Sequence, residues 1–299
     1  MNIAIIGGGS VGLLTASCLN NNSHNLTIVT RTSQQAEAIL NEGLLYVSEK
    51  EKKTVMPKAV PQSDINKLEA DLVIVTLKQT ALDRWFTWAR EKIVLETPLL
   101  FLQNGMGHIE KANKVLPHSI ITGVVTHGAE KVSGTHVIHH GLGKLYTGGP
   151  FSLKSIIRKL EIKAPSHFPI VWEECIEITV KKKLLTNAII NPLTAIYNVK
   201  NGGLLEDSDL KKQVKLLFNE VIQILGLSEH DWALVKNVIQ ETSENTSSMR
   251  ADLKEGRKTE IDAIVGYLLK KGHEQNKKID HLEVVYSKIK SLEKGIIHG

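Results

Sequence analysis

The chain has 299 residues, which is longer than one hydrophobic core usually requires, so two domains are expected. Its formal net charge of +5 comes from lysines spread over the whole length, without a basic stripe that carries interleaved aromatic residues. This distribution favours small anionic ligands and argues against nucleic acid as a partner. A hydrophobic content of 42% and a charged content of 23% exclude an intrinsically disordered chain.

The sequence carries no signal for export, membrane insertion or metal binding. The first six residues, MNIAII, lack the basic region of a signal peptide. No window approaches the roughly 18 uninterrupted apolar residues of a membrane helix. Cys18 and Cys175 predict neither a disulfide framework nor a metal site. A reducing cytoplasm is therefore the expected compartment.

The N-terminal half alternates short apolar runs with helical patterns, which predicts a parallel, doubly wound sheet. The glycine-rich run at residues 134–149 predicts hairpin-like strands that extend the same sheet, and FPIVWEE at 168–174 predicts the last strand. The expected parallel strands are Asn2–Ile6, Asn25–Val29, Asp71–Thr76, Pro98–Leu102 and Ile120–Thr126.

After about residue 175 only helical patterns remain, which predicts an all-helical C-terminal domain. Their apolar faces could cover the domain's own core or form the interface of a homodimer. The expected helices are 175–198, 207–226, 230–254, 259–276 and 280–293.

The first motif is GGGSVG at residues 7–12, which fits G-x-G-x-x-G through Gly7, Gly9 and Gly12. It follows a predicted strand and opens a predicted helix, which is the context of a dinucleotide-binding loop. The variable positions are Gly8, Ser10 and Val11. The sequence therefore predicts a Rossmann-like domain, and a merely structural glycine turn is the alternative.

The residue after the second strand predicts the cofactor. NAD-binding folds usually place an acidic residue there, whereas this chain has Arg31 and no acid until Glu37. A guanidinium group suits a 2′-phosphate, so NADP(H) is favoured. The alternative is a solvated surface arginine.

Two polar residues follow further strands, at the edge of the sheet where ligands of open α/β folds bind. Lys78 ends VTLK, and Asn104 lies in FLQNGMG. An amide beside two glycines fits a turn that faces a ligand, although an ordinary Asn-Gly turn has the same pattern.

A polar stripe crosses the otherwise apolar helix predicted at KKKLLTNAIINPLTA. Lys183, Asn187 and Asn191 have the spacing i, i+4 and i+8, which places them within roughly 80° of one another. Such groups cost several kcal/mol out of water unless something hydrogen-bonds them, and a bound ligand is one candidate. Pro192 predicts a local kink in this helix.

A last polar cluster lies in ENTSSMRADLKEGRKTEID. Asn245 and Ser248 have the spacing i, i+3 and are expected on one face of a helix. Glu260 opens the next helical run with Thr259 as its N-cap, so a helix-dipole or capping role is the alternative to a catalytic one for Glu260.

Taken in order, these motifs resemble the ketopantoate reductase family over essentially the whole chain. K-x3-N-x3-N-P-L-T-A, together with S-S-M and T-E-I-D, carries the specific part of the resemblance. The resemblance implies an α/β fold with an NADP-binding Rossmann-like domain at 1–172, a helical substrate and catalytic domain at 173–299, and an active site in the cleft between them. It also implies NADPH-dependent reduction of 2-dehydropantoate (ketopantoate) to (R)-pantoate in pantothenate biosynthesis.

The resemblance implies roles at the matching positions. Lys183 would be the general acid and Glu260 the acidic partner in the site. The glycine loop, Arg31 and Lys78 would hold the cofactor. Substrate would contact Asn104, which also lies on the cofactor side, and Lys183, Asn187, Asn191, Asn245 and Ser248.

Two alternatives stay open. The first is an NADP-dependent reductase of another branched 2-oxo acid, because the motifs define the chemistry better than the side groups of the substrate. The second is a non-catalytic regulator that senses NADP(H). Against the regulator stands the joint presence of Lys183, Glu260 and both asparagines of the stripe, which a protein without turnover has no chemical reason to keep.

Overall fold

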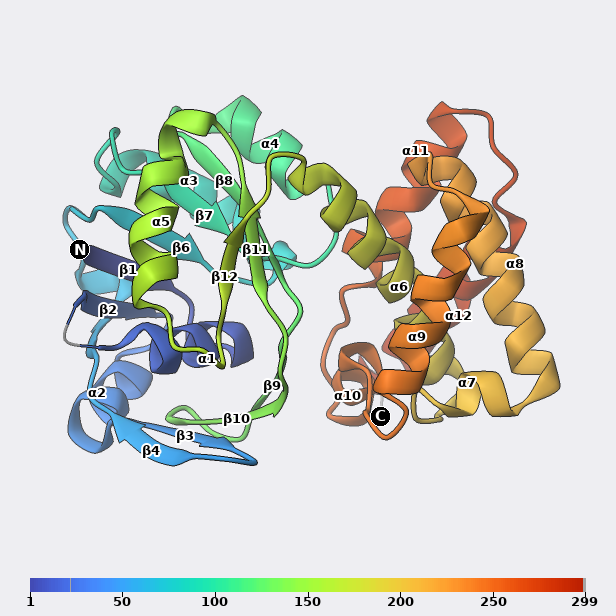
Figure 1. Ribbon diagram of the computed structural model, residues 1–299, viewed down its shortest axis with the longest axis horizontal. Helices are drawn as coiled ribbons and strands as arrows, with labels where there is room; N and C mark the ends of the chain where they lie inside the picture. The colour runs from blue at the N-terminus through green and yellow to red at the C-terminus, as the bar shows by residue number, and fades with distance from the viewer. Residues whose placement is uncertain (22, 298–299) are drawn as a thin grey trace. The chain divides into compact units, whose positions relative to one another are not determined.

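The computed structural model describes residues 1–21 and 23–297. Contacts between residues divide the chain into two compact units; the first is drawn mostly from blue to yellow-green and the second mostly from olive to red in Figure 1. The first unit comprises Met1–Gln103 and His108–Ile176. The second comprises Asn104–Gly107 and the chain from Glu177 onward. The short segment 104–107 therefore belongs with the helical unit although both of its neighbours in the chain belong to the other.

The first unit is built on an eight-stranded sheet with the order β12-β11-β8-β7-β6-β1-β2-β5. All neighbouring strands are parallel except β11, which runs antiparallel to β8. The five parallel strands predicted from apolar runs are all present, with ends that differ by at most one residue. The strands are β1 (Asn2–Ile6), β2 (Asn25–Thr30), β5 (Lys58–Pro61), β6 (Leu72–Val75), β7 (Leu99–Phe101), β8 (Ile120–Val125), β11 (Leu145–Gly148) and β12 (Ile170–Trp172).

Helices cover both faces of this sheet, as a doubly wound fold requires. Successive side chains of a strand point to opposite faces, so Ile3 and Ile5 of β1 pack into one core while Ala4 and Ile6 pack into the other. The first core takes in α1 (Ser10–Leu19), α2 (Ser33–Glu42) and α5 (Lys154–Lys163). The second takes in α3 (Leu82–Lys92) and α4 (His108–Val115). Burial on both faces explains why the central strands read as continuous apolar runs.

A second, four-stranded sheet with the order β4-β3-β10-β9 also belongs to the first unit (Figure 1). The prediction that residues 134–149 extend the main sheet is therefore wrong for β10 and correct for β11. β10 instead pairs with β3 and β9. β3, β4, β5 and β9 were not predicted, because β4 (KKTV) and β9 (GAEK) carry too little apolar alternation to read as strands. The bounds are β3 (Leu44–Ser48), β4 (Lys52–Val55), β9 (Gly128–Lys131) and β10 (His136–Gly141).

Apart from the short segment 104–107, the second unit is helical, as predicted. The single helix expected at 230–254 is wrong, since the chain there forms two helices. The amide N–H of Asn245 donates to the carbonyl of Thr242 in a turn, and Ser247 then caps a new helix by accepting from the amide N–H of Arg250. The helices are α6 (Ile176–Tyr197), α7 (Gly203–Glu206), α8 (Ser208–Leu225), α9 (Trp232–Glu241), α10 (Ser248–Lys254), α11 (Tyr267–Glu274) and α12 (Asp280–Ile297), with a π-helical turn at Asp262–Gly266.

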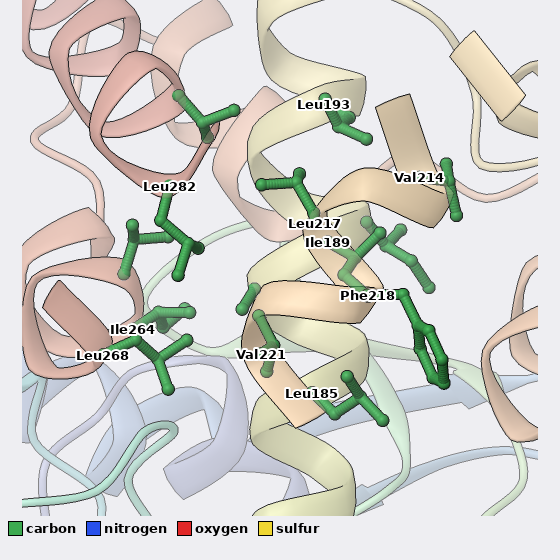
Figure 2. Packing of buried hydrophobic residues seen from close by; sticks show 14 of the residues in the cluster. Leu185, Ile189, Leu193, Val214, Leu217, Phe218, Val221, Ile264, Leu268 and Leu282 are labelled. Carbon is green, nitrogen blue, oxygen red and sulfur yellow. The ribbon is translucent and has the colours of Figure 1, made fainter. Parts of the chain in front are cut away.

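The core of the second unit surrounds α6 (Figure 2). Leu185, Ile189 and Leu193 of α6 belong to one buried cluster with Phe218 of α8, and all four side chains are buried. Burial of each such side chain contributes about 1.5–3 kcal/mol. The apolar faces of these helices thus cover their own core. None of the helices in the described ranges is long and apolar enough to cross a membrane.

Candidate active site

The glycine loop between β1 and α1 has the backbone geometry that its motif predicts. Gly7 has a φ of +113°, and its amide N–H donates to the carbonyl of Val29. A Cβ atom on Gly12 would lie 2.0 Å from the carbonyl oxygen of Gly7, so no larger residue fits without a shift of backbone. Gly9, the residue before α1, faces open space, because a Cβ atom there would meet nothing within 4 Å. The open helix N-terminus fits the diphosphate of a dinucleotide.

Side chains from two distant segments hold the loop from outside. The side-chain amide of Gln35 donates to the carbonyl oxygens of Gly8 and Gly134, each at 2.9 Å. The Lys131 ammonium group donates to the same Gly8 oxygen at 2.8 Å. The sequence did not predict either contact, since the partners are 27 and 123 residues apart and only the fold brings them together.

The other two cofactor candidates of the first unit lie at the carboxyl ends of sheet strands. Arg31 directly follows β2 and is exposed. Lys78 lies three residues after β6, is also exposed and precedes a short 3-10 turn at Gln79–Ala81. Both positions agree with the edge of the sheet at which ligands of such folds bind.

The segment that carries Asn104 packs within the second unit. Gly105 and Gly107 have φ values of +83° and +84°, so the turn requires residues that adopt left-handed backbone. The Asn104 side-chain amide donates to Glu260 Oε2 at 3.2 Å. Asn104 therefore contacts the acidic candidate, which excludes the reading of FLQNGMG as no more than an ordinary Asn-Gly turn.

Lys183 lies on α6, and the pKa of its ammonium group is lower than that of an ordinary lysine. Burial lowers the pKa of its ammonium group to about 8, and the nearby carboxylate of Glu260 acts in the opposite direction by raising it. Such an ammonium group is still mainly protonated near neutral pH, yet gives up its proton more readily than an ordinary lysine. A lysine with this lowered pKa beside a carboxylate has the properties that a general acid requires.

The two asparagines of the polar stripe continue along α6, which is helical through Pro192 to Tyr197. Asn187 is half-buried, and only 8% of Asn191 is exposed. Neither side-chain amide forms a hydrogen bond with any residue in the described parts of the chain. Buried amides normally have partners, so the stripe presents donors and acceptors suited to a ligand.

Asn245 and Ser248 do not share a helix face as expected. Asn245 is exposed in the turn before α10, where its carbonyl accepts from the amide N–H of Asn201. Ser248 is the exposed first residue of α10. The buried hydroxyl is that of Ser247, which accepts from Thr194 of α6 at 2.7 Å. Sequence reasoning missed Ser247, because adjacent serines give no sign of which one caps the helix.

Thr259, and not Glu260, caps the helix that follows. The Thr259 hydroxyl accepts from the amide N–H of Ile261, as predicted for an N-cap, and donates to Glu293. The helical turn that follows, Asp262–Gly266, is π-helical, a distortion that recurs at functional sites. The Glu260 carboxylate instead accepts a hydrogen bond from Asn104 and interacts electrostatically with Lys183.

Comparisons with known proteins identify the family of this chain. Residues 3–150 match the family model described as Ketopantoate reductase PanE/ApbA, and residues 176–293 match the model of its C-terminal part. The chain belongs to the ketopantoate reductase family. It is 42% identical to the 2-dehydropantoate 2-reductase of Bacillus subtilis over 98% of each chain. It is 34% identical to that of Listeria monocytogenes, over 98% of this chain and 97% of the relative.

Solved structures of ketopantoate reductases share the fold. The crystal structure of a probable 2-dehydropantoate 2-reductase from Bacillus subtilis superposes with a TM-score of 0.86 at 41% identity, covering 98% of this chain and all of the other. D-mandelate dehydrogenase with NADH and anilino(oxo)acetate gives a TM-score of 0.88 at 22% identity, covering 99% of each chain. At that identity the likeness shows the fold alone, and the fold therefore does not decide between nicotinamide cofactors.

The candidate residues of this ketopantoate reductase family member fall into two groups, one in each unit. The first group is the glycine loop with Arg31 and Lys78. In the second group the structure brings together Asn104, Lys183 and Glu260. The two amides of the stripe belong to the same unit as these three residues. Within the described residues no three side chains of histidine, cysteine, aspartate or glutamate cluster as metal ligands would.

Proposed function

We propose that this protein reduces 2-dehydropantoate to (R)-pantoate with NADPH, a step in the formation of pantothenate. The observation that carries the proposal is Lys183, whose pKa is about 8 and which lies beside a carboxylate. It shares one stripe with two amides that form no hydrogen bond to the described residues of the chain. Membership of the ketopantoate reductase family supports the same reaction.

Proton transfer in this proposal belongs to Lys183. When bound, NADPH supplies the hydride that reduces the C2 carbonyl carbon of the substrate. Negative charge then develops on the carbonyl oxygen, and the Lys183 ammonium group stabilises this charge and donates the proton that completes the hydroxyl. Glu260 keeps the lysine protonated, because its carboxylate raises the pKa that burial lowers. Asn104 holds Glu260 in place through its hydrogen bond.

The remaining polar residues of the second unit bind the substrate in our proposal. Ketopantoate carries a carboxylate and a hydroxyl group, which need donors and acceptors in fixed positions. The amides of Asn187 and Asn191 and the hydroxyl of Ser248 supply both kinds of group. Asn245 lies three residues before Ser248, in the turn that precedes α10. Exposure of Ser248 and Asn245 leaves both side chains accessible to a ligand.

The choice of NADPH over NADH rests on the first unit. Gly7–Gly12 provides the diphosphate site, Lys78 adds a cation at the sheet edge, and Arg31 occupies the position where NAD-binding chains place an acid. Asn104, which follows β7 in the chain, is assigned to the cofactor as well as to the substrate. The family fold accepts NADH in D-mandelate dehydrogenase, so the preference depends on these residues and not on the architecture.

A panel of substrates and cofactors tests the proposal. We expect rapid oxidation of NADPH with ketopantoate, and much slower oxidation when NADH replaces NADPH or 2-oxoisovalerate replaces ketopantoate. Faster turnover of another branched 2-oxo acid would keep the chemistry and change the substrate. Tight NADPH binding without reduction of any 2-oxo acid would contradict the enzyme and favour a regulator that senses NADP(H).

A further inference from the structure

We propose that Lys131 is a second cation for the 2′-phosphate of the cofactor and forms a clamp with Arg31. This inference rests on the proposed use of NADP(H) and assigns a residue to its recognition. Lys131 lies on β9 of the small sheet, 100 residues after Arg31, and nothing in its local sequence marks it as a ligand.

The position of Lys131 is that of a residue beside the adenosine ribose. In a doubly wound fold the diphosphate lies on the N-terminus of the first helix, and the ribose reaches from there toward the end of the second strand. Here the two ends of that path are Gly9 and Arg31. The Lys131 ammonium group lies near the first end of this path, 2.8 Å from the carbonyl oxygen of Gly8, and its charge interacts with that of Arg31 at the other end.

The hairpin that carries Lys131 is tied to the glycine loop by contacts of other residues. Lys131 pairs with Val137 across the β9–β10 hairpin, and the connection of that hairpin carries Gly134. The Gln35 side chain ties Gly134 to Gly8 through two hydrogen bonds of 2.9 Å. The hairpin is therefore fixed to the glycine loop without Lys131, which leaves the lysine available for a ligand. A preformed site also lowers the entropy cost of binding.

The charges near this site call for an anion. Neither Arg31 nor Lys131 forms an ion pair with a carboxylate in the parts of the chain that the structure describes. Glu130, the acid next to Lys131 in the chain, pairs instead with His140 at 2.6 Å. Burial, and then the charge of Arg31, lower the pKa of Lys131. Two like charges held close together repel each other, and a phosphate that carries nearly two negative charges relieves this repulsion.

Calorimetric titration with 2′,5′-ADP and with 5′-AMP tests the clamp, because the two ligands differ only in the 2′-phosphate. We would compare the intact protein with Lys131→Gln, Lys131→Arg and Arg31→Gln. Lys52→Gln is the matched control, since Lys52 is an exposed lysine of the same small sheet. Thermal unfolding of each variant shows whether the fold is kept.

The clamp predicts that Lys131→Gln weakens binding of 2′,5′-ADP roughly tenfold to a hundredfold, the usual range for one charge-assisted hydrogen bond. Binding of 5′-AMP should change less than about twofold, and Lys131→Arg should retain most of the affinity for 2′,5′-ADP. The control should change the affinity for neither nucleotide.

Equal losses for both nucleotides would mean that Lys131 only shapes the glycine loop, and unchanged affinity for both would mean no contact; either result overturns the clamp. Strong discrimination that depends on Arg31 alone would overturn the clamp and leave the NADP preference intact. If the intact protein binds both nucleotides equally, the clamp and the preference fail together. Reduction of ketopantoate, assayed separately with either cofactor, would still decide the proposed reaction.

Discussion

The two units prepare for their ligands in different ways. In the first unit the backbone does most of the work: Gly7 and Gly12 leave no room for side chains, and the open end of α1 faces solvent. In the second unit the polar stripe lies on α6, a continuous helix, and our proposal gives the chemistry to side chains of this stripe. Changes in the glycine loop should therefore damage structure and binding together, whereas changes in the stripe should separate activity from stability.

The largest expected effect of this contrast is at Gly12. We predict that Gly12→Ala weakens NADPH binding by about a hundredfold and lowers the free energy of unfolding by about 1–3 kcal/mol, because the new Cβ atom collides with the Gly7 carbonyl. Gly9→Ala is the matched control: its Cβ atom meets only open space, so it should weaken binding without lowering Tm. Fluorescence titration and thermal unfolding measure both properties. Normal stability and normal NADPH binding in Gly12→Ala would contradict the view that the first unit binds its ligand mainly through its backbone.

A substitution in the stripe should show the opposite pattern. Asn191→Leu should leave the free energy of unfolding unchanged or raise it by about 1–2 kcal/mol, because the buried amide has no hydrogen-bond partner among the described residues. The KM for ketopantoate should rise about tenfold from the loss of one substrate hydrogen bond.

The same replacement at Asn219 of α8, whose side-chain oxygen is buried without a partner but lies on another helix, should leave KM unchanged. A destabilised Asn191→Leu with normal KM would assign this amide to the fold instead of the site.

Local signals made part of this molecule predictable. Continuous apolar runs predicted β1, β2 and β6–β8, because strands buried on both faces need no polar alternation. The glycine loop and the α6 stripe are also local patterns. Contacts such as Asn104 with Glu260, 156 residues apart, were out of reach of the residues alone, and only the resemblance joined them.

Other features failed for identifiable physical reasons. β4 and β9 are the edge strands of the small sheet and carry charged side chains, so their sequences lack the apolar alternation typical of a strand. Asn245 and Ser248 were wrongly predicted to share a helix face. Which of the adjacent residues Ser247 and Ser248 caps the helix depends on the turn that precedes them, and the local sequence does not show this. Lys131 and Gln35 gave no signal, since their function depends on where a hairpin meets a loop.

A buried hydrogen-bond chain in the first unit predicts a pH-dependent stability. The amide N–H of Gly143 donates to His127 Nδ1, so that atom accepts, and His139 donates to it from Nε2 at 2.9 Å. His139 Nδ1 then accepts from the Tyr46 hydroxyl at 2.8 Å. Burial, followed by the charge of His167, lowers the pKa of His139, which agrees with a neutral ring that donates once and accepts once.

The sign follows from proton binding. Below about pH 6.5, the ordinary pKa of histidine, the unfolded chain binds a proton at His139 that the folded chain does not, so stability falls as the pH decreases. We expect Tm to fall between about pH 7 and pH 5, and His139→Gln to reduce this loss by roughly a few degrees while being less stable at pH 7. Thermal unfolding at both pH values measures it; an identical loss in both proteins would exclude His139 as its source.

The most direct test of the account is the turnover number of Lys183→Ala, measured with saturating ketopantoate beside the dissociation constant for NADPH. We predict that kcat falls about a hundredfold or more, the usual scale for loss of a general acid, while NADPH affinity and Tm stay close to those of the intact protein. Near-normal turnover in this variant would contradict the assignment of Lys183 and, with it, the proposed division of function between the two units.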